Sequence, residues 1–336
     1  MIMNTRTMIL FALLAISLSM CGKKGGGDDG GPPPAPPPVD QPMMLADPFV
    51  LKHDGAYYMY GTSGTTPDAG IPVYQSADGK NWTGPAGKSG QGRALSKGES
   101  YGSSGFWAPE VFFKNGLFYM FYTANEHIAV ATSTSPLGPF TQTVQQPLHD
   151  VKEIDPHVFV DDNGKSYLYF VRFDNGNKTY GAELNDDWKS IKENTITTCI
   201  TQSAEWEIVS GAQWPVTEAP EMLKHKNLYY LFYTANDFRS PAYNVGYATS
   251  SSPLGPFTKY AGSPIVPKTD NIQGTGHNAF VMVGSDLVMY YHAHNSPTAV
   301  GPRRTLFSTA SFEPGADGID VLKINPVKQV PVVKAQ

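Results

Sequence analysis

APEVFFKNGLFYMFY, the stretch formed by residues 108–122, decides the fold of this chain. An apolar run leads into Asn115-Gly116, and a run of Leu, Phe, Tyr and Met returns from it. Asn-Gly between two such runs is typical of a tight β-hairpin. Pro109 stands at the entry of the first strand, where the N–H that proline lacks is needed least. The stretch therefore predicts two antiparallel strands joined by a tight turn.

The same hairpin pattern occurs five times along the chain. Its copies are DPFVLKHDGAYYMY (47–60), APEVFFKNGLFYMFY (108–122), DPHVFVDDNGKSYLY (155–169), APEMLKHKNLYYLFY (219–233) and HNAFVMVGSDLVMYY (277–291). They begin on average about 58 residues apart, which is the length that four strands of five or six residues and their turns need. Five such units account for residues 43–336 and leave no room there for a second domain. We therefore predict an all-β fold, a five-bladed β-propeller over residues 43–336, with little helix.

The first 42 residues predict export. Arg6 precedes an apolar run at residues 8–19, which suits a signal peptide and is short for a membrane span. The run ends in Leu18-Ser19-Met20-Cys21, which resembles the lipobox of bacterial lipoproteins. We expect residues 1–21 to be a lipoprotein-type signal peptide and residues 22–42, rich in Gly, Asp and Pro, to be a disordered tether. The protein would then be anchored to a bacterial membrane only through a lipid on Cys21, or secreted.

Charge and cysteine content narrow the class of protein. The net charge is −5 and the Lys and Arg residues are dispersed, which argues against nucleic acid as a partner. Cys199 is the one cysteine of the predicted propeller, so no disulfide bond stabilises it. A small buried apolar residue is a better interpretation of Cys199 than a nucleophile. We expect the chain to be a monomer.

Three carboxylates and a histidine stand at the starts of the repeats. A propeller brings the starts of its innermost strands together around a central channel, and those positions carry Asp47, Asp155 and His277, while Glu218 directly precedes Ala219. Hydrolysis of a glycosidic bond needs one carboxyl group held neutral and another ionised, and carboxylates placed close together push their pKa values apart. Each carboxylate alone could also cap a turn, but their equivalent positions favour a catalytic site.

Two further glutamates, Glu110 and Glu221, lie two residues after Ala108 and Ala219 in their repeats. We interpret both as structural or as supporting the catalytic residues.

With these motifs in place, the chain resembles the glycoside hydrolases of family 43, which are five-bladed propellers. The likeness runs from about Leu45 to Pro326. Its motifs are Ala46-Asp47-Pro48, Trp107-Ala108-Pro109-Glu110-Val111, Ile154-Asp155-Pro156-His157, Glu218-Ala219-Pro220-Glu221-Met222 and Gly276-His277-Asn278. The family motif around the acid is commonly Glu-Gly-Pro, and here Ala219 replaces the glycine.

The resemblance implies an inverting glycosidase that hydrolyses O-glycosyl bonds. Asp47 matches the general base, Glu218 the general acid, and Asp155 the third carboxylate, which tunes the pKa of the acid and orients it. His277 matches a channel histidine that in many members helps to hold a central calcium or other ion, often through water. No cofactor is implied as a requirement.

Four other residues are candidates for sugar binding, each with a structural alternative. Trp107, Phe106 and Trp214 could form an aromatic platform or pack in the core, and Arg303 could bond sugar hydroxyls or lie on the surface.

The resemblance implies a polysaccharide or oligosaccharide substrate that contains arabinose or xylose, of plant origin. Three other functions are considered. One is a retaining five-bladed glycosidase of the fructan type, and the second is a sugar-binding propeller without catalysis, which would need no paired acid and base. The third is a scaffold or adhesion propeller, which predicts no polar cluster at the channel mouth. Which sugar and linkage are cleaved, and whether inside or at the end of a chain, stays open.

Overall fold

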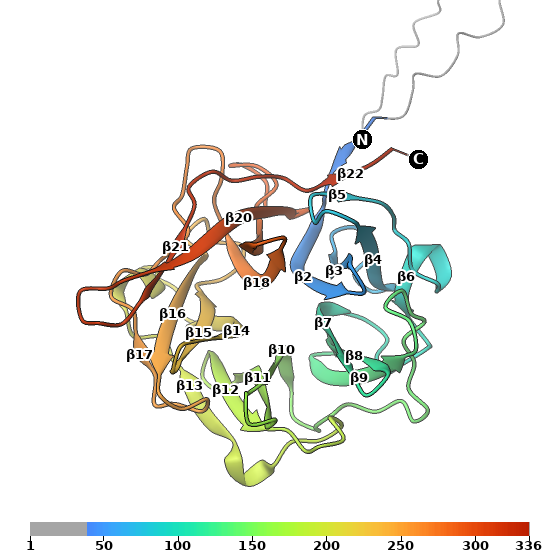
Figure 1. The fold of residues 1–336 in the computed structure, drawn as a ribbon, viewed down its shortest axis with the longest axis horizontal. Coiled ribbons are helices and arrows are strands. Elements are labelled where there is room, and N and C mark those ends of the chain that lie inside the picture. Colours follow the sequence, from blue (N-terminus) through green and yellow to red (C-terminus); the bar gives the residue numbers. More distant parts are fainter. Residues whose placement is uncertain (1–38, 336) are drawn as a thin grey trace, which may run out of the picture. The chain divides into compact units, whose positions relative to one another are not determined.

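The computed structural model describes residues 39–335. The predicted signal peptide, Cys21 and most of the predicted tether lie outside the described residues. The described chain forms five antiparallel sheets, each one a blade, arranged in a ring around a common axis (Figure 1). The prediction of an all-β, five-bladed β-propeller is confirmed. Within residues 39–335, no helix has the length and apolarity to cross a membrane.

Each blade is built from consecutive strands of the chain. Blade 1 contains β2 (Leu45–His53), β3 (Ala56–Ser63), β4 (Gly70–Ser76) and β6 (Arg93–Ser96), and blade 2 contains β7 (Trp107–Lys114), β8 (Leu117–Ala124) and β9 (His127–Ser133). Blade 3 contains β10 (Glu153–Val160), β11 (Ser166–Phe173), β12 (Asn177–Glu183) and β13 (Thr197–Ile200). Blade 4 contains β14 (Thr217–His225), β15 (Leu228–Ala235), β16 (Asn244–Ser250) and β17 (Thr258–Lys259), and blade 5 contains β18 (Gly276–Val283), β19 (Asp286–Ala293), β20 (Arg304–Glu313) and β21 (Val321–Ile324). Three short 3₁₀ turns, Gly90–Gly92, Glu193–Thr195 and Glu205–Glu207, are the helical segments of the described range.

The predicted hairpins form the two inner strands of every blade. In blade 2, Asn115 and Gly116 both have positive φ angles, 52° and 81°, which is the conformation that a two-residue hairpin turn requires. Glycine tolerates it without strain, and asparagine tolerates it better than most residues. The sequence Asn-Gly therefore sets the register Lys114↔Leu117 through Glu110↔Phe121.

A β-bulge interrupts the innermost strand of every blade at the start of the sequence repeat. In β2, Ala46 pairs with Thr62 and Phe49 with Tyr60, so Asp47 and Pro48 lie between them without ladder partners. The strand thus begins before Pro48, and the proline lies in the bulge and not at the strand entry as expected; the bulge accommodates its missing N–H. One residue of each bulge has a left-handed backbone, namely Asp47, Ala108, Asp155, Ala219 and His277, with φ angles of 43–55°.

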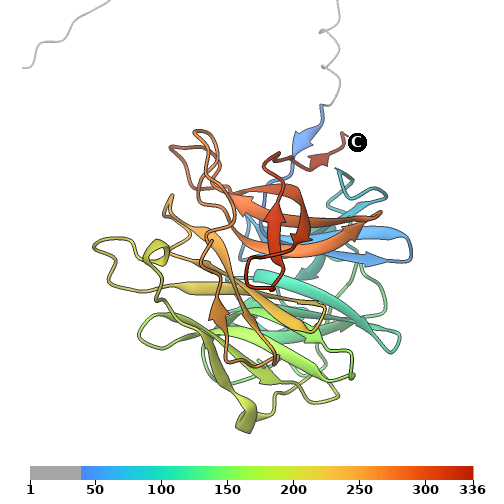
Figure 2. The ribbon, with the colours of Figure 1, turned by 60° about the vertical axis from the view of Figure 1, so that its left-hand side comes forward.

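A small sixth sheet joins the two ends of the described chain (Figure 2). β1 (Gln41–Pro42) pairs with β22 (Val332–Val333), which in turn pairs with β5 (Asn81–Trp82). The hydroxyl of Thr305 in blade 5 also donates to the carbonyl of Leu45 in blade 1, at 2.9 Å. These contacts close the ring between the last and the first blade.

The hydrophobic core consists of five clusters, one at each junction between neighbouring blades. Aromatic side chains dominate them: Phe106 stacks on Tyr122 at the first junction, and Trp82 meets Tyr290 edge-on at the last. Burying one Phe or Met side chain stabilises a fold by about 1.5–3 kcal/mol, so the repeated aromatic strands hold neighbouring blades together. Cys199 is a half-buried member of this packing, and burial raises its pKa to about 12, which fits the structural interpretation.

Candidate active site

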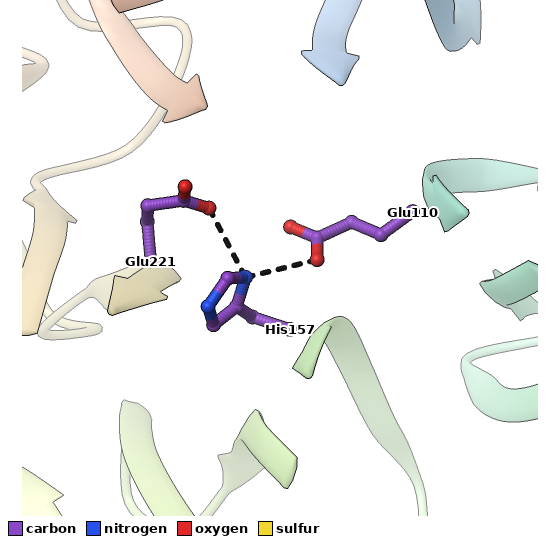
Figure 3. Close-up of side chains that lie close together, drawn as sticks. All are labelled: Glu110, His157 and Glu221. Atoms are coloured by element: carbon purple, nitrogen blue, oxygen red, sulfur yellow. Dashed lines mark hydrogen bonds and ion pairs between the residues drawn. The ribbon is translucent and has the colours of Figure 1, made fainter. Parts of the chain in front are cut away.

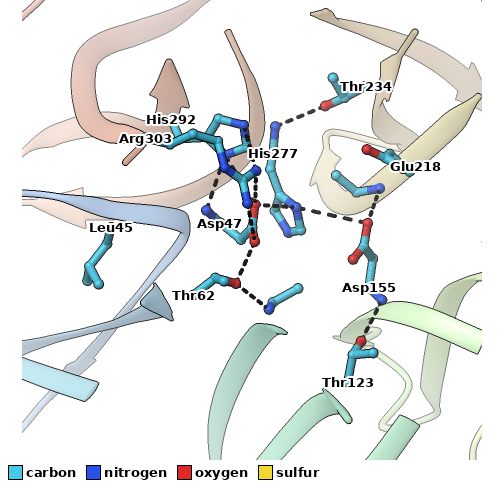
Figure 4. Close-up of polar contacts among 12 residues, drawn as sticks. Leu45, Asp47, Thr62, Thr123, Asp155, Glu218, Thr234, His277, His292 and Arg303 are labelled. Carbon is cyan, nitrogen blue, oxygen red and sulfur yellow. Dashed lines mark hydrogen bonds and ion pairs between the residues drawn. The ribbon is translucent and has the colours of Figure 1, made fainter. Parts of the chain in front are cut away.

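A cavity of about 690 Å³ lies where the five innermost strands begin. Its lining includes Asp47, Asp155, Glu218 and His277, which come from four different blades (Figure 4). Three further residues proposed from sequence, Trp107, Trp214 and Arg303, line the same cavity. Seven sequence-predicted residues therefore meet in one place, three of them in bulges and the other four in segments outside the bulges.

Side chains of the preceding blade hold the bulges in position. The N–H groups of Ala108, Asp155 and His277 donate to threonine hydroxyls at 3.0, 3.1 and 3.0 Å. The acceptors Thr62, Thr123 and Thr234 occupy the same position of the second strand in blades 1, 2 and 4. This bond fixes the left-handed residue of each bulge against its neighbour.

The junction from blade 3 to blade 4 departs from this arrangement. Val171 occupies the equivalent position of β11, paired with Ile154, and its side chain has no acceptor. The N–H of Ala219 donates instead to Oδ2 of Asp155, at 3.1 Å. Asp155 therefore holds the bulge that follows Glu218, in addition to lining the cavity.

The carboxylate of Asp47 is buried and contacts donors through both oxygens. The hydroxyl of Thr62 donates to Oδ2 at 2.5 Å, and Nη1 of Arg303 donates to Oδ1 at 3.0 Å. Nδ1 of His277 lies 3.3 Å from Oδ1. Burial acts to raise the pKa of Asp47. The charge of Arg303, together with His277 and His292, outweighs burial and holds this pKa well below its usual range. Asp47 is therefore ionised at neutral pH.

His292 takes the place of the threonines at the junction from blade 5 to blade 1. The backbone N–H of Asp47 donates to Nδ1 of His292 at 3.1 Å, and Nε2 lies 3.1 Å from Nη1 of Arg303. Nδ1 also lies 3.1 Å from Oδ1 of Asp47. Burial and the charge of Arg303 lower the pKa of His292 to about 3, so this histidine is neutral at neutral pH and holds the backbone of Asp47 in place.

Glu218 has the opposite electrostatic environment. Burial raises its pKa to about 7, and the charge of Asp47 acts in the same direction. Two hydrogen bonds reduce the effect: Oη of Tyr243 donates to Oε1 and Nδ2 of Asn177 donates to Oε2, both at 2.9 Å. Glu218 can therefore carry a proton near neutral pH.

Asp155 is electrostatically coupled to Glu218. Burial and then the charge of Glu218 raise the pKa of Asp155 well above its usual range. At neutral pH the pair formed by Asp155 and Glu218 therefore retains a proton, while Asp47 in the same cavity stays ionised. One neutral and one ionised carboxyl group are the two states that acid–base cleavage of a glycosidic bond requires.

The contacts of His277 leave one ring nitrogen for the cavity. Its ring is 13% exposed, and Nδ1 lies between Asp47 and Asp155, 3.3 and 3.9 Å from their oxygens. Nε2 forms no hydrogen bond with the described residues. This position fits the expectation that His277 faces the channel, and Nε2 is the atom that would contact a water or an ion.

A second polar cluster, formed by Glu110, His157 and Glu221, is fully buried (Figure 3). Nδ1 of His157 lies 2.9 Å from Oε2 of Glu110 and 3.0 Å from Oε2 of Glu221. These three side chains have the donor types of a metal site. However, the N–H of Met222 donates to Nε2 of His157 at 3.0 Å, so the proton must lie on Nδ1. His157 therefore presents an N–H to the two carboxylates, and a metal would have to displace that proton.

One sequence-predicted residue does not reach the cavity. Phe106 is fully buried and stacks on Tyr122 in the core between blades 1 and 2. The prediction that it contacts substrate does not fit this position, because its ring is enclosed by core side chains. Trp107, the next residue, points to the other side and lines the cavity.

Sequence reasoning missed His157, three polar residues that line the cavity, and a histidine behind Asp47; these four residues at the site are Thr62, Asn177, Tyr243 and His292. A signal for two of them exists. Thr62 and His292 follow the aromatic strand of their repeats at the position that carries Thr123 and Thr234 elsewhere. The other two, Asn177 and Tyr243, lie outside the repeated hairpins, and no pattern indicates them.

Comparison with known proteins is consistent with this geometry. The family model described as "Glycosyl hydrolases family 43" matches residues 38–317. A crystal structure of an endo-1,4-beta-xylanase from Bacteroides thetaiotaomicron is 40% identical, with a TM-score of 0.80 over 88% of this chain and 99% of that one. A thermostable family-43 glycoside hydrolase is 36% identical, with a TM-score of 0.76 over 88% of this chain and 96% of that one.

An arabinoxylan arabinofuranohydrolase of Bacillus subtilis is 32% identical in an alignment of 260 residues, and the match covers 63% of this chain and 48% of that protein. This chain spans about half the length of the first curated relatives that it matches.

Proposed function

The chain belongs to glycosyl hydrolases family 43, and from that premise we propose that it is an inverting glycosidase with Asp47 as general base and Glu218 as general acid. Asp155 tunes the pKa of Glu218 and holds the backbone beside it. The observation that carries the proposal is the separation of charge within one cavity. Arg303 keeps Asp47 ionised, whereas burial raises the pKa of Glu218 to about 7.

The proposed reaction follows from these protonation states. Ionised Asp47 takes a proton from a water molecule, which attacks the anomeric carbon. Protonated Glu218 gives its proton to the glycosidic oxygen as the bond breaks. Thr62 and Arg303 fix the direction of the Asp47 carboxylate, and His292 accepts from the backbone N–H of Asp47. Tyr243 and Asn177 fix the direction of the Glu218 carboxyl group.

We propose an arabinose- or xylose-containing plant polysaccharide as substrate, with a xylan chain, with or without arabinose, as the first candidate. Support comes from two similar proteins, one described as an endo-1,4-beta-xylanase and the other as an arabinoxylan arabinofuranohydrolase. Trp107 and Trp214 on the cavity wall supply apolar surface for sugar rings.

We also propose that the propeller of residues 43–336 acts outside the cytoplasm, held by a lipid on Cys21 or secreted. The apolar run and Cys21 in the first 21 residues support this location. Metabolic labelling with a fatty acid, compared between the full chain and Cys21→Ala, tests the anchor. Label that persists in Cys21→Ala would contradict it.

The substrate and the mechanism are tested together with arabinoxylan, xylan, linear arabinan and the nitrophenyl glycosides of xylose and arabinofuranose. We expect hydrolysis of at least one xylose- or arabinose-containing substrate. The first product formed should have the inverted anomeric configuration, measured by NMR before mutarotation. Retained configuration would support the fructan-type alternative, and binding without products would support a sugar-binding propeller.

A further inference from the structure

We propose that Trp214, through Asn177, couples the binding of the leaving-group sugar to the protonation of Glu218. The inference rests on the proposed function and deepens it, because it assigns Trp214 to the leaving-group side of the site and Asn177 as a positioning residue.

The coupling consists of two hydrogen bonds in series. Nε1 of Trp214 donates to Oδ1 of Asn177 at 2.8 Å, and Nδ2 of Asn177 donates to Oε2 of Glu218 at 2.9 Å. An indole N–H can only donate, so it fixes the orientation of the amide. With Oδ1 bound to the indole, the NH₂ group has to face Glu218. The bond from Asn177 lowers the pKa of Glu218 against the larger effect of burial.

The backbone keeps Asn177 in this position. Its N–H donates to the carbonyl of Pro215 at 2.8 Å, and the hydroxyl of Thr217 donates to its carbonyl at 3.2 Å. Gly176, with a φ of +134°, packs so closely that an added Cβ would lie 2.6 Å from Pro215. The start of β12 is therefore fixed against the segment that connects Trp214 with Glu218.

The two oxygens of Glu218 face different sides of the cavity. Oε1 accepts from Tyr243, whose ring stacks on His292 with 5.6 Å between centroids, and His292 contacts Asp47. Oε2 accepts from Asn177 on the other side. In an inverting reaction the water attacks from the side of the base, and the leaving group departs toward the acid. Trp214 therefore lies on the leaving-group side.

The exposure of Trp214 fits a binding surface. The side chain is 51% exposed although its N–H is engaged, and it lines the cavity. A tryptophan fixed at its polar edge offers its apolar face to a ligand. A sugar ring on the leaving-group side would cover this face, remove water from the hydrogen bonds behind it and strengthen them.

The coupling can be measured without turnover. The chain has five tryptophans, and ¹H–¹⁵N spectra resolve their indole N–H signals; the signal that disappears in Trp214→Phe belongs to Trp214. We expect its chemical shift to titrate with the pKa of Glu218, near 7, and to become flat in Glu218→Gln and in Asn177→Ala. An indole signal that is flat in the parent protein, or that titrates unchanged in Glu218→Gln, would overturn the proposal. This readout holds even if the protein hydrolyses nothing, so it separates this inference from the proposed function.

The pH dependence of hydrolysis gives the kinetic test. Trp214→Phe and Asn177→Ala both weaken the donor to the Glu218 carboxylate, so the alkaline limb of kcat/KM should move to higher pH. Trp214→Ala should in addition raise KM for an oligosaccharide, whereas Trp214→Phe retains a ring and should not. The matched control is Ile208→Ala, because Ile208 is exposed on the same segment and lies outside the cavity. It should leave the alkaline limb of kcat/KM and the KM for the oligosaccharide unchanged. Parent-like alkaline limbs in Trp214→Phe and Asn177→Ala would contradict the coupling.

Discussion

The guanidinium group of Arg303 lies 3.0 Å from Oδ1 of Asp47, although 256 positions separate the two residues in the chain. The same nitrogen lies 3.1 Å from Nε2 of His292. Arg303 therefore determines the charge of the proposed base and also contacts the histidine that accepts the backbone N–H of Asp47. Any hydrogen bond from Arg303 to a sugar hydroxyl would be secondary to this contact.

Replacing Arg303 should move the acid limb of activity. Arg303→Met removes the largest influence that lowers the pKa of Asp47, so that pKa rises. Because Asp47 must be ionised to accept a proton, the rise of kcat/KM with pH should shift to higher pH. Arg239→Met is the matched control, since Arg239 lines the same cavity but pairs with Asp237 at 2.5 Å. An unchanged acid limb in Arg303→Met would contradict the assignment of Asp47 as base.

Asp47→Asn should abolish most of the hydrolysis while the fold survives. The amide cannot take a proton from water, and general base catalysis contributes about 10²–10⁴-fold, so kcat should fall by at least that factor. The amide oxygen can still accept from Thr62, which keeps the local structure. Steady-state rates and circular dichroism on the same samples check both statements. Activity within tenfold of the parent would remove Asp47 from its role.

Glu218→Gln should separate natural from activated substrates. An oligosaccharide needs a proton on its leaving oxygen, whereas nitrophenolate departs unaided. We expect a large loss of kcat on the oligosaccharide, a much smaller one on the nitrophenyl glycoside, and loss of the alkaline limb. Equal losses on the two substrates would contradict the role of Glu218 as acid.

Asp155 has a structural and an electrostatic role that a double substitution should separate. Asp155→Ala removes the acceptor for the N–H of Ala219, and an unsatisfied buried N–H costs about 1–3 kcal/mol. Adding Val171→Thr supplies a hydroxyl at the position that Thr62, Thr123 and Thr234 occupy in other blades. Thermal unfolding should show recovered stability in the double variant.

Val171→Thr should not restore the electrostatic role of Asp155. Asp155 and Glu218 are coupled, so removing the Asp155 carboxyl group removes the repulsion that opposes ionisation of both. The alkaline limb should therefore move to lower pH in Asp155→Ala with or without Val171→Thr. Asp155→Asn, which keeps an acceptor oxygen, should show the shifted limb with little loss of stability. A double variant with the parent's pH profile would show that Asp155 is structural only.

The buried cluster of Glu110, His157 and Glu221 should affect stability in opposite directions when its members are replaced. Burial raises the pKa of Glu110 to about 7, from an ordinary value of 4.5. A carboxyl group whose pKa is higher in the folded than in the unfolded state makes the fold less stable as the pH rises from the ordinary pKa of the group through 7. Glu110→Gln removes this loss and keeps an acceptor, so its melting temperature should exceed that of the parent at pH 8 but not at pH 4.

His157→Leu should be destabilising across the same pH range. It leaves two buried carboxylates without the donor between them and removes the acceptor of the Met222 N–H. Removing one partner of a buried charged group costs about 3–5 kcal/mol. A melting temperature within a degree or two of the parent would contradict the proton position assigned to His157.

The repeats predicted the blades because a hairpin is a local structure, determined by turn residues and aromatic strands close together in the chain. They also predicted the meeting of Asp47, Asp155 and His277, because equivalent positions of a ring converge. The role of Arg303 could not be predicted from the repeats. It lies outside the hairpins, and its contact with Asp47 depends on the closure of blade 5 against blade 1.

Phe106 and Trp107 show that the sequence does not determine which of two adjacent aromatic side chains faces the cavity. Both are aromatic and both precede the second repeat, yet one is enclosed in the core and the other lines the cavity. Neighbouring side chains of a strand point to opposite faces, but the sequence does not say which face is which until the bulge sets the register.

The sixth sheet links closure of the ring to a strand that follows all five blades in the sequence. Every blade is continuous in the chain, whereas this sheet pairs β22 with β1, which precedes the first blade, and with β5. The cavity is lined by residues of all five blades, and the proposed base Asp47 in the first blade contacts Arg303, which directly precedes β20 of the last. A truncated variant that lacks β22 keeps all five blades but loses this connection between the ends, so the contact between Arg303 and Asp47 is the part of the site that such a truncation should weaken.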